Sequence, residues 1–208
     1  GILTARTFAN EHGDIVEVVF NGGIPWPEAL DDKPFSAAVH EVFSRRPPEG
    51  KKLFLYIGAL NTDRSGLVAY FGEKEGLPLP PPWDGYALNS PQVKRAYANF
   101  VLRAVREMKP DFLAIGIECN VLLSRSTTKW AQYVELHAAT YRAVKAEHPK
   151  LPVCFSTDVL HYKKVAPEAK GTDQETAVAE LMKHSDLMAL SVYPHMSADV
   201  ARPVTGGF

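Results

Sequence analysis

The stretch Asp111–Leu123, DFLAIGIECNVLL, decides which fold we expect for this chain. It has the apolar run of a parallel strand buried on both faces, and it carries one carboxylate, Glu118, toward its carboxyl end. Because side chains alternate along a strand, an inward-pointing Glu118 would share its face with Ala114 and Gly116. The branched residues of the opposite face, where we expect covering helices, are Leu113, Ile115 and Ile117. A carboxylate at the mouth of a buried strand is costly to desolvate, which indicates a function for Glu118.

Length and composition are those of an ordinary globular domain. The chain has 208 residues, of which 46% are apolar and 23% charged, and no break in composition divides it, so we expect one domain over residues 1–208. The net charge of −1 gives no reason to expect nucleic acid or an acidic membrane as a partner. The sequence contains no run of eighteen apolar residues, so it does not predict a membrane-spanning helix. The chain opens on Gly1 without a basic and apolar leader, which leaves the compartment open.

Cysteines and histidines give no metal or cofactor signal. Cys119 and Cys154 fall in neighbouring predicted strands, where we expect small buried side chains; a disulfide or a metal pair is the alternative. The seven histidines show no His-x-His or His-Glu-x-x-His spacing. We therefore predict neither a metal nor a cofactor.

Five predicted strands alternate with helices along the chain. The other four strands are expected at Asp14–Phe20, Lys52–Leu60, Pro152–Asp158 and Asp186–Tyr193. The clearest helix begins at Ser90 and Pro91, a good N-cap followed by proline at the first helical position, and it stops at Pro110. This alternation predicts an α/β fold with a parallel sheet.

The long connections follow strands and the short ones follow helices, which favours a (β/α) barrel with its functional face at the carboxyl ends of the strands. The longest connection runs from Asn61 to Asn89. A doubly wound sheet would also fit. It would more often carry a glycine-rich phosphate turn after its first strand, and Gly22-Gly23 is too weak a signal for one.

Two short motifs give the chain a resemblance to the clan A glycoside hydrolases, barrels that include endo-β-galactanases, glucanases and mannanases. They are GIECN at Gly116–Asn120 and SVYPH at Ser191–His195, the second similar to a Ser-x-Tyr-Pro segment on the sixth strand of galactanase-like enzymes. The resemblance implies an acid/base glutamate at the end of strand four and a nucleophile glutamate at the end of strand seven. The chain would then be an incomplete (β/α)8 TIM-type barrel holding about strands two to six.

Two features depart from this family pattern. Ile117 stands where the clan has asparagine directly before the acid/base glutamate, and Asn120, two places after Glu118, is the candidate replacement. The chain also ends at Phe208, before a seventh strand, so we expect the nucleophile beyond its C-terminus.

The resemblance assigns Glu118 as the catalytic acid/base; the alternative is a structural carboxylate paired with a lysine or arginine. Apart from Asn120, the expected substrate-binding residues also have simpler interpretations: a turn for Asp158 and Asn61, apolar packing for Trp26 and Trp83, a capping aromatic for Tyr193, and a surface loop residue for His195. The predicted substrate-binding residues are Asn120, Asp158, Tyr193, Asn61, Trp26 and His195.

The resulting hypothesis is a glycoside hydrolase-like protein that cleaves O-glycosidic bonds of a β-linked polysaccharide or oligosaccharide by a retaining two-carboxylate mechanism. Its first alternative is a catalytically inactive or carbohydrate-binding relative. Its second is a barrel lyase or aldolase, which would need a lysine at a strand end, and Lys163 and Lys164 lie in a polar run instead. Open sheet edges predict self-association. An extracellular location would suit a polysaccharide hydrolase.

Overall fold

Five parallel strands form one sheet in the order in which they occur along the chain. A computed structural model describes residues 7–8, 11–20 and 22–193. The strands are β1 (Ile15–Phe20), β2 (Lys52–Ile57), β3 (Phe112–Ala114), β4 (Val153–Asp158) and β5 (Leu187–Ser191). The predicted α/β class with a parallel sheet is confirmed, and each of the five predicted strand regions holds a strand.

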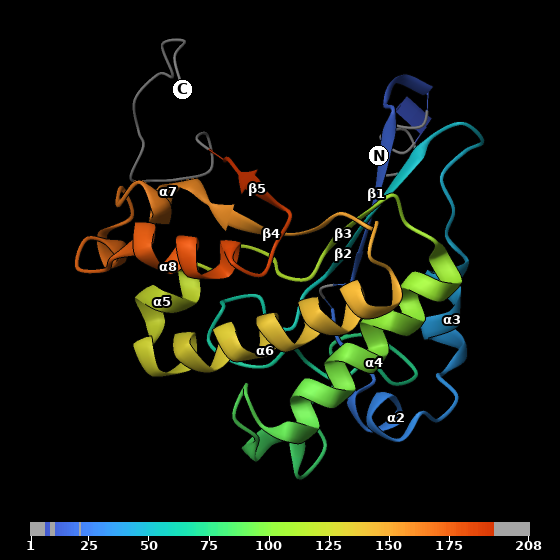
Figure 1. The fold of residues 1–208 in the computed structure, drawn as a ribbon. Helices are drawn as coiled ribbons and strands as arrows, with labels where there is room; N and C mark the ends of the chain where they lie inside the picture. Colours follow the sequence, from blue (N-terminus) through green and yellow to red (C-terminus); the bar gives the residue numbers. More distant parts are fainter. Residues whose placement is uncertain (1–6, 9–10, 21, 194–208) are drawn as a thin grey trace.

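The main helices lie against one face of this sheet (Figure 1). They are α2 (Trp26–Asp31), α3 (Ala37–Ser44), α4 (Pro91–Met108), α5 (Val121–Arg125), α6 (Thr127–Glu147), α7 (Val159–Tyr162) and α8 (Gln174–Met182). Two single 3₁₀ turns, Trp83–Gly85 and Pro167–Ala169, lie in the connections. None of the helices in the described ranges is long and apolar enough to cross a membrane.

The core lies between the sheet and the two long helices, α4 and α6. Leu55 and Ile57 of β2 and Leu113 of β3 are fully buried there, as the alternation along each strand predicts. Tyr97 of α4 is also fully buried, and its hydroxyl lies 2.8 Å from the carbonyl oxygen of Ile57 and 2.9 Å from that of Ile115. This hydroxyl ties the helix to two neighbouring strands where they end.

The opposite face of the sheet is uncovered within the described part of the chain. Ile15 of β1 and Leu187 of β5 are 47% and 48% exposed, and Phe54 and Phe112 line an apolar hollow of about 270 Å³ between them. In a barrel this face would be the interior. Each of the outer strands, β1 and β5, has a single neighbour in the sheet, so both edges are unpaired among the described residues.

β3 is shorter than predicted, and its alternation fails beyond Ala114. The carbonyl of Gly116 still accepts from the amide of Ser156 on β4 at 2.9 Å, the chain then turns, and the amide of Cys119 donates back to the carbonyl of Ser156 at 3.2 Å. A side chain at Gly116 would collide with the hydroxyl of Tyr133 on α6, so this position faces the helices. Ile117 lies on the open face instead. The expected faces of Gly116 and Ile117 are therefore wrong, because the strand ends before them.

Candidate functional site

A polar pocket of about 580 Å³ lies on the open face, toward the carboxyl ends of the strands. Four strands and the connection after β2 contribute to it, as do residues just beyond β3 and β5. Its polar lining residues are Glu17, Tyr56, Arg64, Glu118, Ser156, Ser191 and Tyr193. A second hollow of about 640 Å³ includes Asp111 and Pro152, which precede β3 and β4. It lies at the amino ends of the strands, away from Glu118. In barrels, residues at this end stabilise the fold, and the active site lies at the opposite end.

Glu118 enters the pocket from an unusual backbone conformation. Its φ of 49° lies in the left-handed region, which is unfavourable for a glutamate, and its amide donates a 2.9 Å hydrogen bond to Oγ of Ser156 on β4. Strained residues of this kind cluster where a side chain has to be aimed. Glu118 therefore reaches the predicted edge of the sheet, but from a turn and not from a strand.

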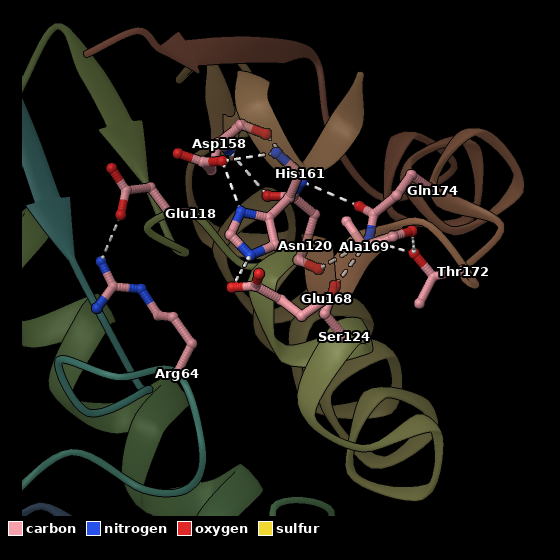
Figure 2. A network of polar contacts seen from close by, with 10 residues as sticks. All are labelled: Arg64, Glu118, Asn120, Ser124, Asp158, His161, Glu168, Ala169, Thr172 and Gln174. Carbon is pink, nitrogen blue, oxygen red and sulfur yellow. Dashed lines mark hydrogen bonds and ion pairs between the residues drawn. The ribbon is translucent and has the colours of Figure 1, made fainter. Parts of the chain in front are cut away.

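Arg64, in the connection after β2, forms an ion pair with Glu118 (Figure 2). Its Nη2 donates to Oε2 of Glu118 at 3.0 Å, and its Nε donates to the carbonyl of Ile117 at 2.8 Å. Nη1 donates to the carbonyls of Asn61 and Thr62 at 3.0 and 2.7 Å. The side chains of Arg64 and Glu118 are only 13% and 20% exposed. The guanidinium is thus anchored on every nitrogen, and the geometry matches the alternative of a carboxylate paired with an arginine.

Asn120 is a buried structural residue. It is 0% exposed, and its Oδ1 accepts from the amide of Asp158 at 2.8 Å. Its Nδ2 donates to the carbonyl of Asp158 and to Oε1 of Gln174, each at 3.0 Å. The side-chain amide of Asn120 thus joins the turn after β3 to the end of β4, and it lies outside the lining of the pocket.

Asp158 ends β4, and its side chain caps α7. This is a structural role like the turn that the sequence analysis gave as the alternative to substrate binding. Its Oδ1 accepts from the backbone amide of His161 at 2.8 Å and lies 2.7 Å from Nδ1 of the same residue (Figure 2). Nε2 of His161 lies 3.2 Å from Oε1 of Glu168. Burial alone would raise the pKa of Asp158, but the hydrogen bonds from His161 outweigh it and lower that pKa. Burial likewise opposes the charge of His161, and the two carboxylates prevail and raise the pKa of the imidazole.

Two further predicted contacts are placed elsewhere by the fold. Trp26 is 0% exposed, donates from Nε1 to the carbonyl of Val68 at 3.1 Å, and stacks on the buried Trp83 at 5.5 Å between ring centroids. Neither indole can stack on a sugar in this arrangement. Asn61 forms a turn: its Oδ1 accepts from the amides of Ser65 and Gly66 at 2.8 and 3.2 Å. In the structure, Trp26 thus packs in the core and Asn61 holds a turn.

Tyr193 is the predicted contact that stays at the pocket with Glu118. It is 48% exposed and lies among the lining residues just after β5. His195 lies outside the described residues. Tyr193 thus remains a candidate for substrate binding.

The cysteines carry no reactive chemistry in this arrangement. Both are buried and free, and burial raises the pKa of each thiol to about 12. Sγ of Cys119 lies 2.9 Å from the hydroxyl of Tyr133, on the helix side of the sheet and away from the pocket. In the described ranges, no group of three histidine, cysteine, aspartate or glutamate side chains could hold a metal ion.

Sequence reasoning missed five polar residues of the pocket, of which Ser191 was noted only as part of a motif: Glu17, Tyr56, Arg64, Ser156 and Ser191. For Glu17 a signal was present, because it stands at the period-two position before Val19 in an otherwise apolar strand. For Arg64 there was none, because its partner lies 54 residues away along the chain.

Comparisons with known proteins support the fold. No protein-family model matches the chain, and no curated protein matches it. Among solved structures, it is similar to the Ignisphaera aggregans GH53 catalytic domain, with 18% sequence identity and a TM-score of 0.50. The match covers 89% of this chain and 51% of that chain, so the chain spans about half the length of the structure it resembles. Together with the five-stranded parallel sheet, this similarity shows an α/β fold like part of a TIM barrel. It does not single out the galactanases.

Proposed function

We propose that this chain is the part of a glycoside hydrolase barrel that carries the acid/base residue, and that the substrate is a β-linked polysaccharide. The observation that carries the proposal is the position of Glu118. It lies at the carboxyl edge of a sheet that is folded like part of a glycoside hydrolase domain, and it lines a polar pocket of about 580 Å³. Polar pockets at this edge are where barrel enzymes bind and transform their substrates.

In the proposed retaining reaction, Glu118 protonates the leaving oxygen in the first step and then removes a proton from water in the second. The nucleophile is a carboxylate on a barrel strand beyond β5, roughly 5–5.5 Å from Glu118. Ser156 holds the Glu118 backbone, and Tyr193 contacts the saccharide or the nucleophile. A salt bridge is made by the ionised carboxylate, so saccharide entry has to loosen the contact with Arg64 before Glu118 can act as an acid.

The test is the Glu118→Gln substitution in the protein that contains this chain, assayed on a panel of β-linked polysaccharides. We expect hydrolysis to fall by a factor of about 100 or more, because glutamine cannot transfer the proton. An aryl glycoside with a good leaving group, which needs no protonation, should still release its aryl group in the first step. The control is Glu49→Gln, the same change at an exposed turn position outside the pocket. Hydrolysis that survives Glu118→Gln unchanged would remove the acid/base role.

A catalytically inactive, carbohydrate-binding relative is the second candidate. Two observations favour it: Glu118 is already paired with Arg64, and Ile117, in place of the family asparagine, puts an apolar side chain into the pocket. This candidate predicts saccharide binding without hydrolysis in the parent protein. Binding that is unaffected by Glu118→Gln, together with no turnover of either substrate type, would favour it over the enzyme.

A further inference from the structure

The charges that line the pocket leave one carboxylate unbalanced. Within the described ranges, three charged side chains line it: Glu17, Arg64 and Glu118. Arg64 and Glu118 neutralise each other at 3.0 Å, and the remaining nitrogens of Arg64 donate to backbone carbonyls. The arginine is therefore not available to bind an anionic ligand. What remains is the negative charge of Glu17.

Glu17 lies on β1, on the pocket side of the sheet. It shares this face with Val19 and with Tyr56 of the neighbouring strand, and no residue in the described ranges forms an ion pair or a hydrogen bond with its side chain. Its position on the sheet removes part of its water, which raises the pKa of its carboxyl even though the side chain is still exposed to the pocket. An ionised carboxylate in such a place is stabilised by a cationic hydrogen-bond donor.

Directly across from Glu17 on β2 is Phe54, and two residues further along that strand Tyr56 brings a neutral hydroxyl to the pocket. Burial raises the pKa of Tyr56, and charge on Cys154, Glu17 and Tyr193 adds to that effect, so the phenol keeps its proton. Tyr56 and Ser191 supply polar atoms without charge, and Tyr193 supplies an exposed aromatic ring. Hydroxyls and an aromatic face suit a sugar ring. The unpaired carboxylate of Glu17 favours a ring that carries a positively charged substituent.

We infer that the pocket selects saccharide units that bear a protonated amine, as in a 2-amino-2-deoxyhexose, and that Glu17 accepts hydrogen bonds from the ammonium group. This inference rests on the proposed function and names its substrate class. Uronic acid units are disfavoured, because Glu17 repels their carboxylate and the paired Arg64 does not compensate. Acetylating the amine removes the charge and the preference with it.

The experiment measures binding by titration calorimetry at pH 6 to the protein that contains this chain, in which the sheet is completed. The four probes are β-1,4-linked hexamers of glucosamine, N-acetylglucosamine and galactose, and a β-linked glucuronate oligomer. The first two differ only in the amine. A hydrogen bond between charged groups corresponds to about 10- to 100-fold in affinity, so we expect the glucosamine hexamer to bind that much more tightly than its acetylated counterpart.

Glu17→Gln keeps the shape of the side chain and removes its charge. We expect this variant to lose the preference for the glucosamine hexamer over the acetylated hexamer. Glu49→Gln, an equal change of net charge at an exposed position, should keep the preference. A second readout needs no variant: in the wild-type chain the preference should weaken as pH falls, starting above the range in which an ordinary glutamate protonates.

The outcomes separate this inference from the proposed function. Equal affinity for the two glucosamine-type hexamers, tightest binding of glucuronate, or a preference that survives Glu17→Gln would each overturn the inference and leave saccharide binding standing. If none of the four probes binds, the proposed function fails and the inference fails with it.

Discussion

Among single residues, two that line the pocket have backbone conformations that are unfavourable for their residue types. Glu118 and Arg64 both have left-handed backbone conformations, with φ of 49° and 55°, and neither is a glycine. Such conformations cost about 1–3 kcal/mol each and persist where surrounding contacts hold them. Here the contacts are those of Arg64 to Glu118 and to the carbonyls around it. The strain serves to aim one carboxylate into the pocket.

Asn120 offers a test of the residue roles. Replacing it with alanine leaves the backbone amide and carbonyl of Asp158 without their partner, because the site is fully buried. We expect Asn120→Ala to lower the free energy of unfolding by about 2–4 kcal/mol in urea titrations. Asn61→Ala, at a turn that is less buried, should cost less. A stable Asn120→Ala chain with weakened saccharide binding would contradict the structural role and restore the sugar contact.

At the scale of elements, the connection from β4 to α8 is held by one charged cluster. His161 on α7 lies between Asp158 at the end of β4 and Glu168 in the 3₁₀ turn Pro167–Ala169 (Figure 2). Asn120 fixes the backbone of Asp158 from the other side. Hydrogen bonds and ion pairs therefore join the turn that carries Glu118 to the connection after β4.

This cluster predicts a pH dependence with a defined sign. The pKa of His161 is raised in the folded chain, so its stabilising effect is complete below its ordinary value of 6.5 and is lost as pH rises through the raised value. The pKa values of Asp158 and Glu168 are lowered, so their effect is complete above their ordinary values of 3.8 and 4.5 and is lost as pH falls. We expect the connection to be most stable between about pH 4.5 and 6.5.

Hydrogen exchange of the amides of residues 159–173 measures this dependence locally. A local readout is needed because His137 acts in the opposite direction: burial lowers its pKa to about 4, so its contribution to global stability is lost as pH falls below 6.5. We expect exchange in the connection to accelerate as pH rises past 7, beyond the intrinsic increase, and His161→Gln to abolish the excess. An excess that is unchanged in His161→Gln would show that another group holds the connection.

At the scale of the whole molecule, the sheet has a covered face and an open one. The open face carries exposed apolar side chains, among them Ile15 at 47%, Leu187 at 48% and Leu190 at 56% exposure. A closed barrel buries this face and pairs both edges. The pocket on this face therefore depends on whatever completes the sheet.

We expect the isolated chain to self-associate through this face and its edges. Sedimentation velocity should show a weight-average coefficient that rises with concentration in the micromolar range. Leu187→Lys should reduce this rise, because a charge on the open face opposes burial. Val165→Lys is the matched control, since Val165 is 41% exposed outside the sheet. A compact monomer at every concentration would contradict the expectation.

The fold was accessible from sequence because its signals are local. Proline and serine at the start of α4, and alternating apolar residues in β2, predict the elements, and the long connections after strands indicate the functional edge. The site was less accessible. Asn120 and Trp26 stand at sequence positions where a substrate-binding residue is expected. Only their contacts with Asp158 and Val68, which are distant along the chain, show that both side chains hold the fold together. Contacts of this kind leave no periodic trace in the sequence.

The most direct measurement is a crystal structure of the protein that contains this chain, carrying Glu118→Gln and soaked with a β-linked oligosaccharide. We expect a saccharide in the pocket, with a bridging glycosidic oxygen about 2.6–3.2 Å from the side-chain amide of residue 118. A saccharide bound elsewhere, with the pocket closed by the Arg64 connection, would contradict the account and leave Glu118 as a structural partner of Arg64.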